Sequence, residues 1–343
     1  MASLNFRTEK LNFKNFYSKN QTVLDNARLM FSTLISSLLS AEKNISLYSI
    51  SSRLKSRDEA VRKFTRKYQE SLENEKIPYE IKDHITDLVG LRIVLLYESD
   101  IQVVGDILKS EFDVIEVTNK TRILESKGDA FGYKGLHLDL KLSASRAAMR
   151  EYAPYASLRF EVQIRTIIQD AWSVLDHKIK YKKAIPKYLE RRINSLAALF
   201  EIADREFLNI HEDTQAEEAK AHQHQNGDEN INAFTFSQII KDKLSGFAND
   251  ESRIGEFVDF LLSYGDLSYN QLVEYIDRYH DLVYGFFNQI KKMIKKNYQM
   301  DVMSFLFFVL YAADRKKYKD IIHGMAEGEF LEYLNSTGKG GTV

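Results

Sequence analysis

The chain has 343 residues, of which 44% are hydrophobic and 28% are charged, and its formal net charge is −1 at pH 7. This length predicts two domains, and this charge argues against a protein that coats nucleic acid through a globally basic surface. There is no cysteine, which excludes disulfides, thiolate metal sites and cysteine nucleophiles and suits a reducing compartment. Because charges are spread through the first residues, we expect no secretory signal and a cytoplasmic protein.

Helix patterns dominate the first part of the chain. Apolar residues at helical spacing predict an amphipathic helix over 22–40, within an N-terminal helical segment, residues 1–44. A second helix is predicted after Ser56, because Ser56 and Glu59 have the spacing of a capping box.

Strand patterns follow and alternate with helix patterns. Residues 88–97 are rich in Val, Ile and Leu and predict a buried strand. Half-buried strands are predicted where apolar and polar residues alternate, at 112–118, 136–142 and 158–164. Helices are predicted after Ser99, from about Thr166 to Lys183, and after Pro186. This order predicts an α+β domain with a mixed β-sheet and flanking helices.

The last third of the chain has a different composition. Residues 213–232 contain almost no large apolar side chain and predict an exposed linker or a frayed helix end. Residues 233–343 show no strand pattern, so we expect an all-helical C-terminal domain. The apolar run 303–313 would extend roughly 17 Å as a helix, well short of the roughly 30 Å hydrocarbon layer, and predicts a core helix with no membrane segment.

Two acidic residues are candidates for a metal site. Glu161 lies in mid-strand between Arg159 and Gln163, and a carboxylate beside arginines suits Mg²⁺ bound to phosphate. Alternating charges are also typical of a strand face in solvent. Asp87 precedes the apolar strand, where it could meet the same metal or serve as an ordinary turn residue.

Basic residues provide a second candidate feature. Arg92 interrupts an apolar run, so its charge requires a partner or a ligand. A basic cluster around the second helix suits a triphosphate or a solvated helix face; its members are Arg53, Lys55, Arg57, Arg62, Lys63, Arg66 and Lys67. The glycine-rich loop 128–135 could bring Tyr133 against a base or simply connect two strands.

Four segments, in this order, resemble the RelA/SpoT-type synthetase family, the alarmone synthetases. They are SRLKSRDEAVRK (52–63), DLVGLR (87–92), FGYKGLH (131–137) and FEVQIRTIIQDAWSVLDHKIKYK (160–182). On this resemblance we assign residues 45–212 to a synthetase domain with a trailing helix. The resemblance implies a nucleotidyltransferase-like synthetase fold. It also implies transfer of the β,γ-pyrophosphate of ATP, with Mg²⁺, to the 3′-hydroxyl of GDP or GTP, which makes (p)ppGpp. No histidine–aspartate metal module precedes these segments, so we expect no alarmone hydrolysis.

The resemblance implies roles on the donor side of the site. Arg53 and Lys55 would bind ATP, and Lys63 would contact its phosphates. Arg92 would stack on adenine opposite Arg53. Asp87 would hold Mg²⁺.

The resemblance also implies roles on the acceptor side. Glu161 would complete the metal site or activate the acceptor hydroxyl. Tyr133 would stack on the acceptor guanine with His137 beneath it. Gln163 and Arg165 would line the pocket.

Departures from the family pattern fall on the acceptor side and leave two further hypotheses. Gly135 stands where the family has a loop serine, and residues 124–130 replace a Y-I-x-x-P-K stretch. The second hypothesis is a toxin of this family that pyrophosphorylates the tRNA 3′ end. Its C-terminal domain would restrain it until a regulatory protein, such as a phage protein, binds. The third is a catalytically inactive nucleotide sensor.

Overall fold

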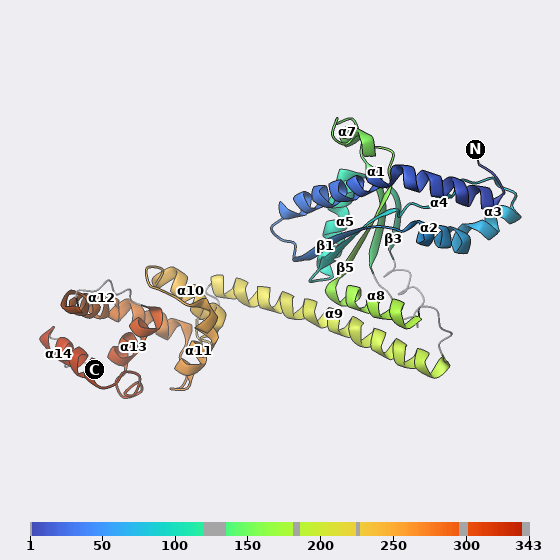
Figure 1. Ribbon diagram of the computed structural model, residues 1–343. Helices are drawn as coiled ribbons and strands as arrows, with labels where there is room; N and C mark the ends of the chain where they lie inside the picture. The colour runs from blue at the N-terminus through green and yellow to red at the C-terminus, as the bar shows by residue number, and fades with distance from the viewer. Residues whose placement is uncertain (1, 120–134, 181–185, 224–226, 295–300, 338–343) are drawn as a thin grey trace. The chain divides into compact units, whose positions relative to one another are not determined.

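The computed structural model describes residues 2–119, 135–180, 186–223, 227–294 and 301–337. The chain forms two compact units, Met1–Ile210 and His211–Val343. The first unit contains a five-stranded mixed sheet with flanking helices, and the described part of the second unit is helical (Figure 1). The predicted fold class is therefore confirmed.

The sheet places two distant strands side by side. Its order is β1 (Leu47–Leu54), β2 (Val89–Leu95), β5 (Phe160–Thr166), β4 (Leu136–Leu142) and β3 (Phe112–Asn119). β2 and β5 are parallel, and the other neighbours are antiparallel. The carboxyl ends of β2 and β5 therefore meet at one edge of the sheet.

β1 is a strand that the sequence pattern does not predict. The register shifts between Leu47 and Ser49, so one extra residue interrupts the pairing with β2. Such a bulge breaks the period-two alternation from which a strand is recognised. β1 is also an edge strand of this sheet, with a neighbour on one side only.

One face of the sheet is apolar and is covered by α1 (Phe6–Ser40) and α5 (Ser99–Glu111). The ring of Phe31 on α1 stacks on Phe160 of β5, with centroids 4.0 Å apart. The N-terminal helix is longer than the predicted 22–40, and it belongs to the core of the first unit. It buries residues from Phe13 onward against the same cluster as the strands.

Three further helices accompany the sheet. α2 (Arg57–Phe64) begins at the predicted capping box, where Ser56 and Glu59 bond reciprocally. α8 (Ile167–Lys180) follows β5 directly. α9 (Lys187–His222) packs on α8 through Trp172 and Phe200, whose ring centroids lie 5.5 Å apart. The remaining short elements of this unit are Thr65–Gln69, Glu70–Asn74 (α3), Ile81–His84 (α4), Ala144–Ala147 (α7) and Ala153–Tyr155.

The structure differs from the predicted linker over 213–232, because α9 continues as a helix to His222. Residues 213–222 are mostly Ala, Glu, Gln and Lys, which favour a helix even without an apolar face to bury. The division between the two units falls inside this helix, between Ile210 and His211.

The C-terminal unit has its own core. Its helices are Ala233–Lys243 (α10), Ile254–Leu262 (α11), Tyr269–Ile294 (α12), Val302–Ala313 (α13) and Met325–Ser336 (α14), with a 3₁₀ turn at Glu251–Arg253. α13 contains the apolar run that predicted a core helix, and Phe305, Leu306 and Val309 on it are fully buried. Among the described residues, no helix is long and apolar enough to cross a membrane.

Candidate active site

Two rows of residues cross the polar face of the sheet, because residues paired between neighbouring strands point to the same side. The first row is Arg53, Gly90, Glu161, Asp139 and Glu116, and the second is Ser51, Arg92, Gln163, His137 and Thr118. Five predicted site residues, from four strands, therefore share one surface: Arg53, Arg92, His137, Glu161 and Gln163.

The carboxylate of Asp87, just before β2, is paired with two lysines. Lys55 contacts Oδ2, and the Nζ of Lys63 lies 3.0 Å from Oδ1. Only 8% of the Asp87 side chain and 10% of the Lys55 side chain are exposed. Burial lowers the pKa of Lys55, although the hydrogen bond and charge of Asp87 oppose this shift. Both lysines predicted to bind ATP thus surround the carboxylate predicted to hold Mg²⁺.

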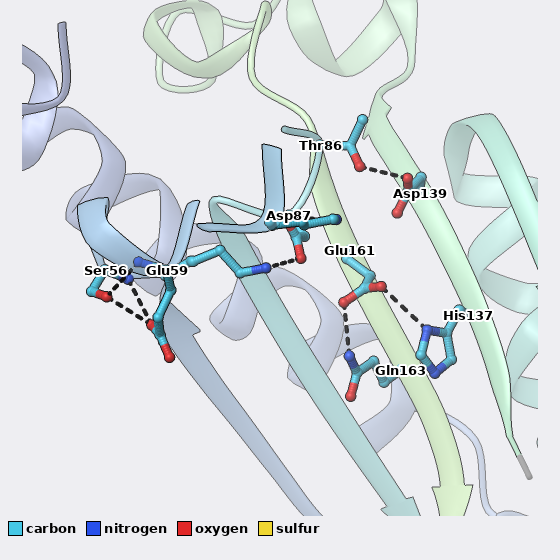
Figure 2. Close-up of polar contacts among 10 residues, drawn as sticks. Ser56, Glu59, Thr86, Asp87, His137, Asp139, Glu161 and Gln163 are labelled. Carbon is cyan, nitrogen blue, oxygen red and sulfur yellow. Dashed lines mark hydrogen bonds and ion pairs between the residues drawn. The ribbon is translucent and has the colours of Figure 1, made fainter. Parts of the chain in front are cut away.

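Glu161 is held by two neighbours on the polar face (Figure 2). The Nε2 of Gln163 donates to its Oε2 over 2.7 Å, and the Nδ1 of His137 lies 3.2 Å from its Oε1. Burial raises the pKa of Glu161, but His137, Gln163 and the charge of Lys63 outweigh burial and lower this pKa to about 2. Glu161 is therefore ionised at neutral pH.

Asp87 and Glu161 lie on the same side of the sheet (Figure 2). Lys63, which is paired with Asp87, also lowers the pKa of Glu161, so both carboxylates lie within range of one cation. Mg²⁺ is commonly held by one or two carboxylates together with waters and substrate phosphates, and this pair fits that pattern. In the part of the chain that the structure describes, no three His, Asp or Glu side chains form a metal site on their own. Substrate phosphates would have to complete the ligand set.

Asp139 is a third carboxylate at the site, and the sequence did not single it out. It pairs with Glu161 across β4 and β5, and its Oδ2 accepts a hydrogen bond of 2.7 Å from Thr86. Burial raises the pKa of Asp139; the Thr86 hydrogen bond opposes this rise and the charge of Glu161 adds to it. The strict alternation of 136–142, with His137 and Asp139 on one side, was the signal that could have found it.

A pocket of about 140 Å³ opens beside the carboxylates, and its lining includes Arg53, Gly90, Arg92 and Gln163. Arg53 and Arg92 come from neighbouring strands, β1 and β2. A Cβ built on Gly90 would lie 3.7 Å from the Cγ of Arg53, which is an ordinary contact. A side chain at this position would therefore lie against Arg53 in the lining of the pocket.

The position of Arg165 differs from the one that the sequence predicts. The sequence predicts that Arg165 lines the pocket, but only 1% of the residue is exposed. Its guanidinium is enclosed by protein, and it donates to Gln163 and, over 3.1 Å, to the Oδ1 of Asp170. A guanidinium so deeply buried requires such partners, and they hold it away from the surface. The same carboxylate oxygen of Asp170 lies 3.1 Å from the Nη1 of Arg92.

The acceptor loop is described only at its end. Tyr133 lies outside the described residues. Gly135 has a φ of 143°, a conformation that glycine adopts easily and serine would adopt only with strain. The backbone thus gives a physical reason for glycine where the family has a loop serine.

The geometry agrees with similarities to known proteins. The family described as "Region found in RelA / SpoT proteins" matches residues 52–185. GTP pyrophosphokinase YwaC from Bacillus subtilis is 35% identical over 161 residues, which are 46% of this chain and 71% of the relative. The chain belongs to the RelA/SpoT family. GTP pyrophosphokinase YjbM from the same organism is 25% identical over 162 residues, which are 47% of this RelA/SpoT chain and 74% of the relative.

Solved structures show a more distant likeness. The small alarmone synthetase 1 from Bacillus subtilis has a TM-score of 0.45 and 20% sequence identity. The match covers 60% of this RelA/SpoT chain and 98% of the solved structure's chain. The small alarmone synthetase 2 from the same organism has a TM-score of 0.44 and 26% identity. The match covers 59% of this RelA/SpoT chain and 99% of the solved structure's chain. The family match covers residues 52–185. It therefore contains the predicted site residues of the sheet, which are Arg53, Arg92, His137, Glu161 and Gln163.

Proposed function

We propose that this protein transfers the β,γ-pyrophosphate of ATP to the 3′-hydroxyl of GDP or GTP and so makes (p)ppGpp. The observation that carries this proposal is the placement of Asp87 and Glu161 on one face, beside a pocket lined by Arg53 and Arg92. The relatives named GTP pyrophosphokinases support the reaction class.

On the donor side, Arg53 and Arg92 would hold the adenine base of ATP. Their planar guanidinium groups can stack on an aromatic ring, and both arginines line the same pocket. Lys55 and Lys63 would release the carboxylate of Asp87 and bind the phosphates of ATP in its place. Mg²⁺ held by Asp87, Glu161 and those phosphates would supply positive charge where the leaving AMP develops negative charge.

In the reaction, the acceptor 3′-hydroxyl would attack the β-phosphorus of ATP and release its proton to water. The bond from this phosphorus to the α,β-bridging oxygen would break, and AMP would leave with its electron pair. Lys63, whose Nζ lies 3.0 Å from the Oδ1 of Asp87, would neutralise the charge that develops. A carboxylate with a pKa of about 2 accepts protons weakly, so the surroundings of Glu161 favour binding of a cation over activation of the hydroxyl. His137 holds Glu161 from the acceptor side.

The decisive experiment incubates the protein with ATP labelled in the γ-phosphate, Mg²⁺ and one acceptor at a time: GDP, GTP or bulk tRNA. Label on a guanine nucleotide is the expected result. Label on tRNA alone would show that tRNA, and not a guanine nucleotide, is the acceptor, and would favour the toxin hypothesis. Label on no acceptor would favour the hypothesis of an inactive nucleotide sensor. Transfer should also cease when EDTA removes the metal; transfer that survives EDTA contradicts the role of Mg²⁺.

Variants test the site itself. We expect Asp87→Asn and Glu161→Gln to reduce transfer by at least about 100-fold, because each removes a charge that the transition state requires. Asp113→Asn is the matched control, since Asp113 is exposed on the edge strand β3 and pairs only with Lys141 among the contacts described. Full activity in both site variants would contradict the proposed site.

A further inference from the structure

Asp170, in the first turn of α8, joins two strands of the site through one carboxylate oxygen. Its Oδ1 accepts a hydrogen bond of 3.1 Å from the Nη1 of Arg165 on β5 and lies 3.1 Å from the Nη1 of Arg92 on β2. β2 and β5 are parallel neighbours, so both arginines approach the start of α8 from the same edge. The guanidinium groups of Arg165 and Arg92 thus share one acceptor atom, the Oδ1 of Asp170.

The buried arginine fixes Asp170. The Arg165 side chain is 2% exposed and is also bound to Gln163, which is itself bound to Glu161. A charge buried this far requires its partner, so Asp170 cannot leave Arg165 without a large cost. The Arg92 side chain, by contrast, is 33% exposed and lines the pocket.

The backbone under Asp170 is fixed as well. Thr166 and Gln169 both donate to the Oδ2 of Asp204 on α9, over 2.9 and 3.2 Å. All three of these residues are buried. The N-terminus of α8 is therefore anchored to α9 and continuous with β5, and Asp170 has little freedom to move.

We infer that Asp170 is a positioning residue for the donor nucleotide: it holds the guanidinium of Arg92 in the orientation that receives the adenine base of ATP. A long arginine side chain loses conformational entropy when it binds a ligand, and an arginine that is already held has lost most of it before ATP arrives. This inference rests on the proposed function, because it takes ATP as the ligand of the pocket. Asp170 itself would not touch the reacting atoms.

The first test compares the full-length protein with Asp170→Asn and Asp170→Glu. Asp170→Asn keeps the size and one oxygen of the side chain but removes its charge. We expect the KM for ATP to rise roughly tenfold, with the KM for the guanine nucleotide changed by less than about twofold, since ATP is the ligand that Arg92 would receive. The melting temperature should fall as well, because the buried Arg165 loses its charged partner. Asp170→Glu should recover part of the loss. A KM for ATP that is unchanged or lowered would overturn the inference.

Binding without turnover gives a second readout. The affinity for α,β-methylene ATP, measured by calorimetry, should fall by the same factor in Asp170→Asn. Wild-type protein that binds this analogue but does not transfer pyrophosphate would contradict the proposed function and leave the inference standing. Wild-type protein that does not bind it would overturn both.

A double-mutant cycle separates positioning of Arg92 from support of the fold. If Asp170 acts through Arg92, Asp170→Asn should add nothing to the ATP affinity lost in Arg92→Gln. Losses that multiply would show that Asp170 acts by another route and would overturn the inference. So would a uniform rise in both KM values. Asp106→Asn, on the exposed side of α5, is the control for removing an ion-paired aspartate.

Discussion

At the scale of single residues, the charged groups of the site are paired with one another. Asp87 is held by Lys55 and Lys63, and Glu161 is held by His137 and Gln163. Breaking a buried pair on one side alone is costly, because it leaves a charge without compensation. A nucleotide phosphate can take the place of a carboxylate beside a lysine. These pairs therefore keep the site ordered, and in the proposed function ligand contacts of the same sign would replace them.

The pKa of Glu161 predicts how this residue affects stability at acid pH. Its pKa in the folded chain, about 2, lies below its ordinary value of 4.5. The carboxylate therefore stabilises the fold above pH 4.5, and this contribution is lost as the pH falls toward 2. Between pH 6 and pH 3.5 the wild-type protein should lose about 1 kcal/mol of unfolding free energy more than Glu161→Gln does.

Urea unfolding at the two pH values measures this difference, because the other carboxyl groups titrate in both proteins and cancel. Identical pH dependence in the two proteins would contradict the lowered pKa. The comparison needs no substrate, so its outcome does not depend on the proposed activity.

At the scale of elements, α1 supports the sheet on the side opposite the site. Phe31 is fully buried and stacks on Phe160, the residue that precedes Glu161 on β5. Adjacent residues of a strand point to opposite faces, so packing on the apolar face fixes the strand that carries the candidate carboxylate Glu161. The N-terminal helix is therefore needed for the geometry of the site although it contributes no predicted ligand.

Phe31→Ala should lower the free energy of unfolding by about 3–5 kcal/mol, because it removes a fully buried ring and leaves a cavity. Leu29→Ala is the matched control on the same helix, since Leu29 is 51% exposed and its truncation should cost less than about 0.5 kcal/mol. Chemical denaturation of the two variants measures both effects. Equal stabilities would show that α1 does not belong to the core.

At the scale of the whole molecule, the two units have separate hydrophobic cores. No buried residue of the synthetase core lies beyond residue 210 in the described part of the chain, and α9 ends at His222. Removal of the C-terminal unit after Asn232 should therefore leave the synthetase unit folded. We propose that the C-terminal unit restrains the activity, as the family resemblance implies.

The protein ending at Asn232 tests this proposal. Its melting temperature and circular dichroism should report a folded domain, and its expression should slow cell growth more than expression of the full-length chain does. The same truncation with Glu161→Gln controls for effects unrelated to activity. Equal growth with the truncated and full-length proteins would contradict the restraint.

Local patterns in the sequence determined most of the elements. The capping box at Ser56, the strand 136–142 and the core helix over 303–313 depend on neighbours a few residues apart, so the sequence alone predicted them correctly. The four motif segments likewise identified the family. β1 escaped prediction because its bulge breaks the alternation on which such a prediction depends.

Only the tertiary structure decided which side chains meet. Asp139 faces Glu161 because strands far apart in the sequence pair in one particular register, Asp170 of α8 holds Arg92 of β2, and Arg165 is buried. A shift of one residue would turn the side chains of a strand to the opposite face, and periodicity within one strand carries no information about its partner's register. The sequence thus determined what each segment is, and the pairing of distant segments determined the site.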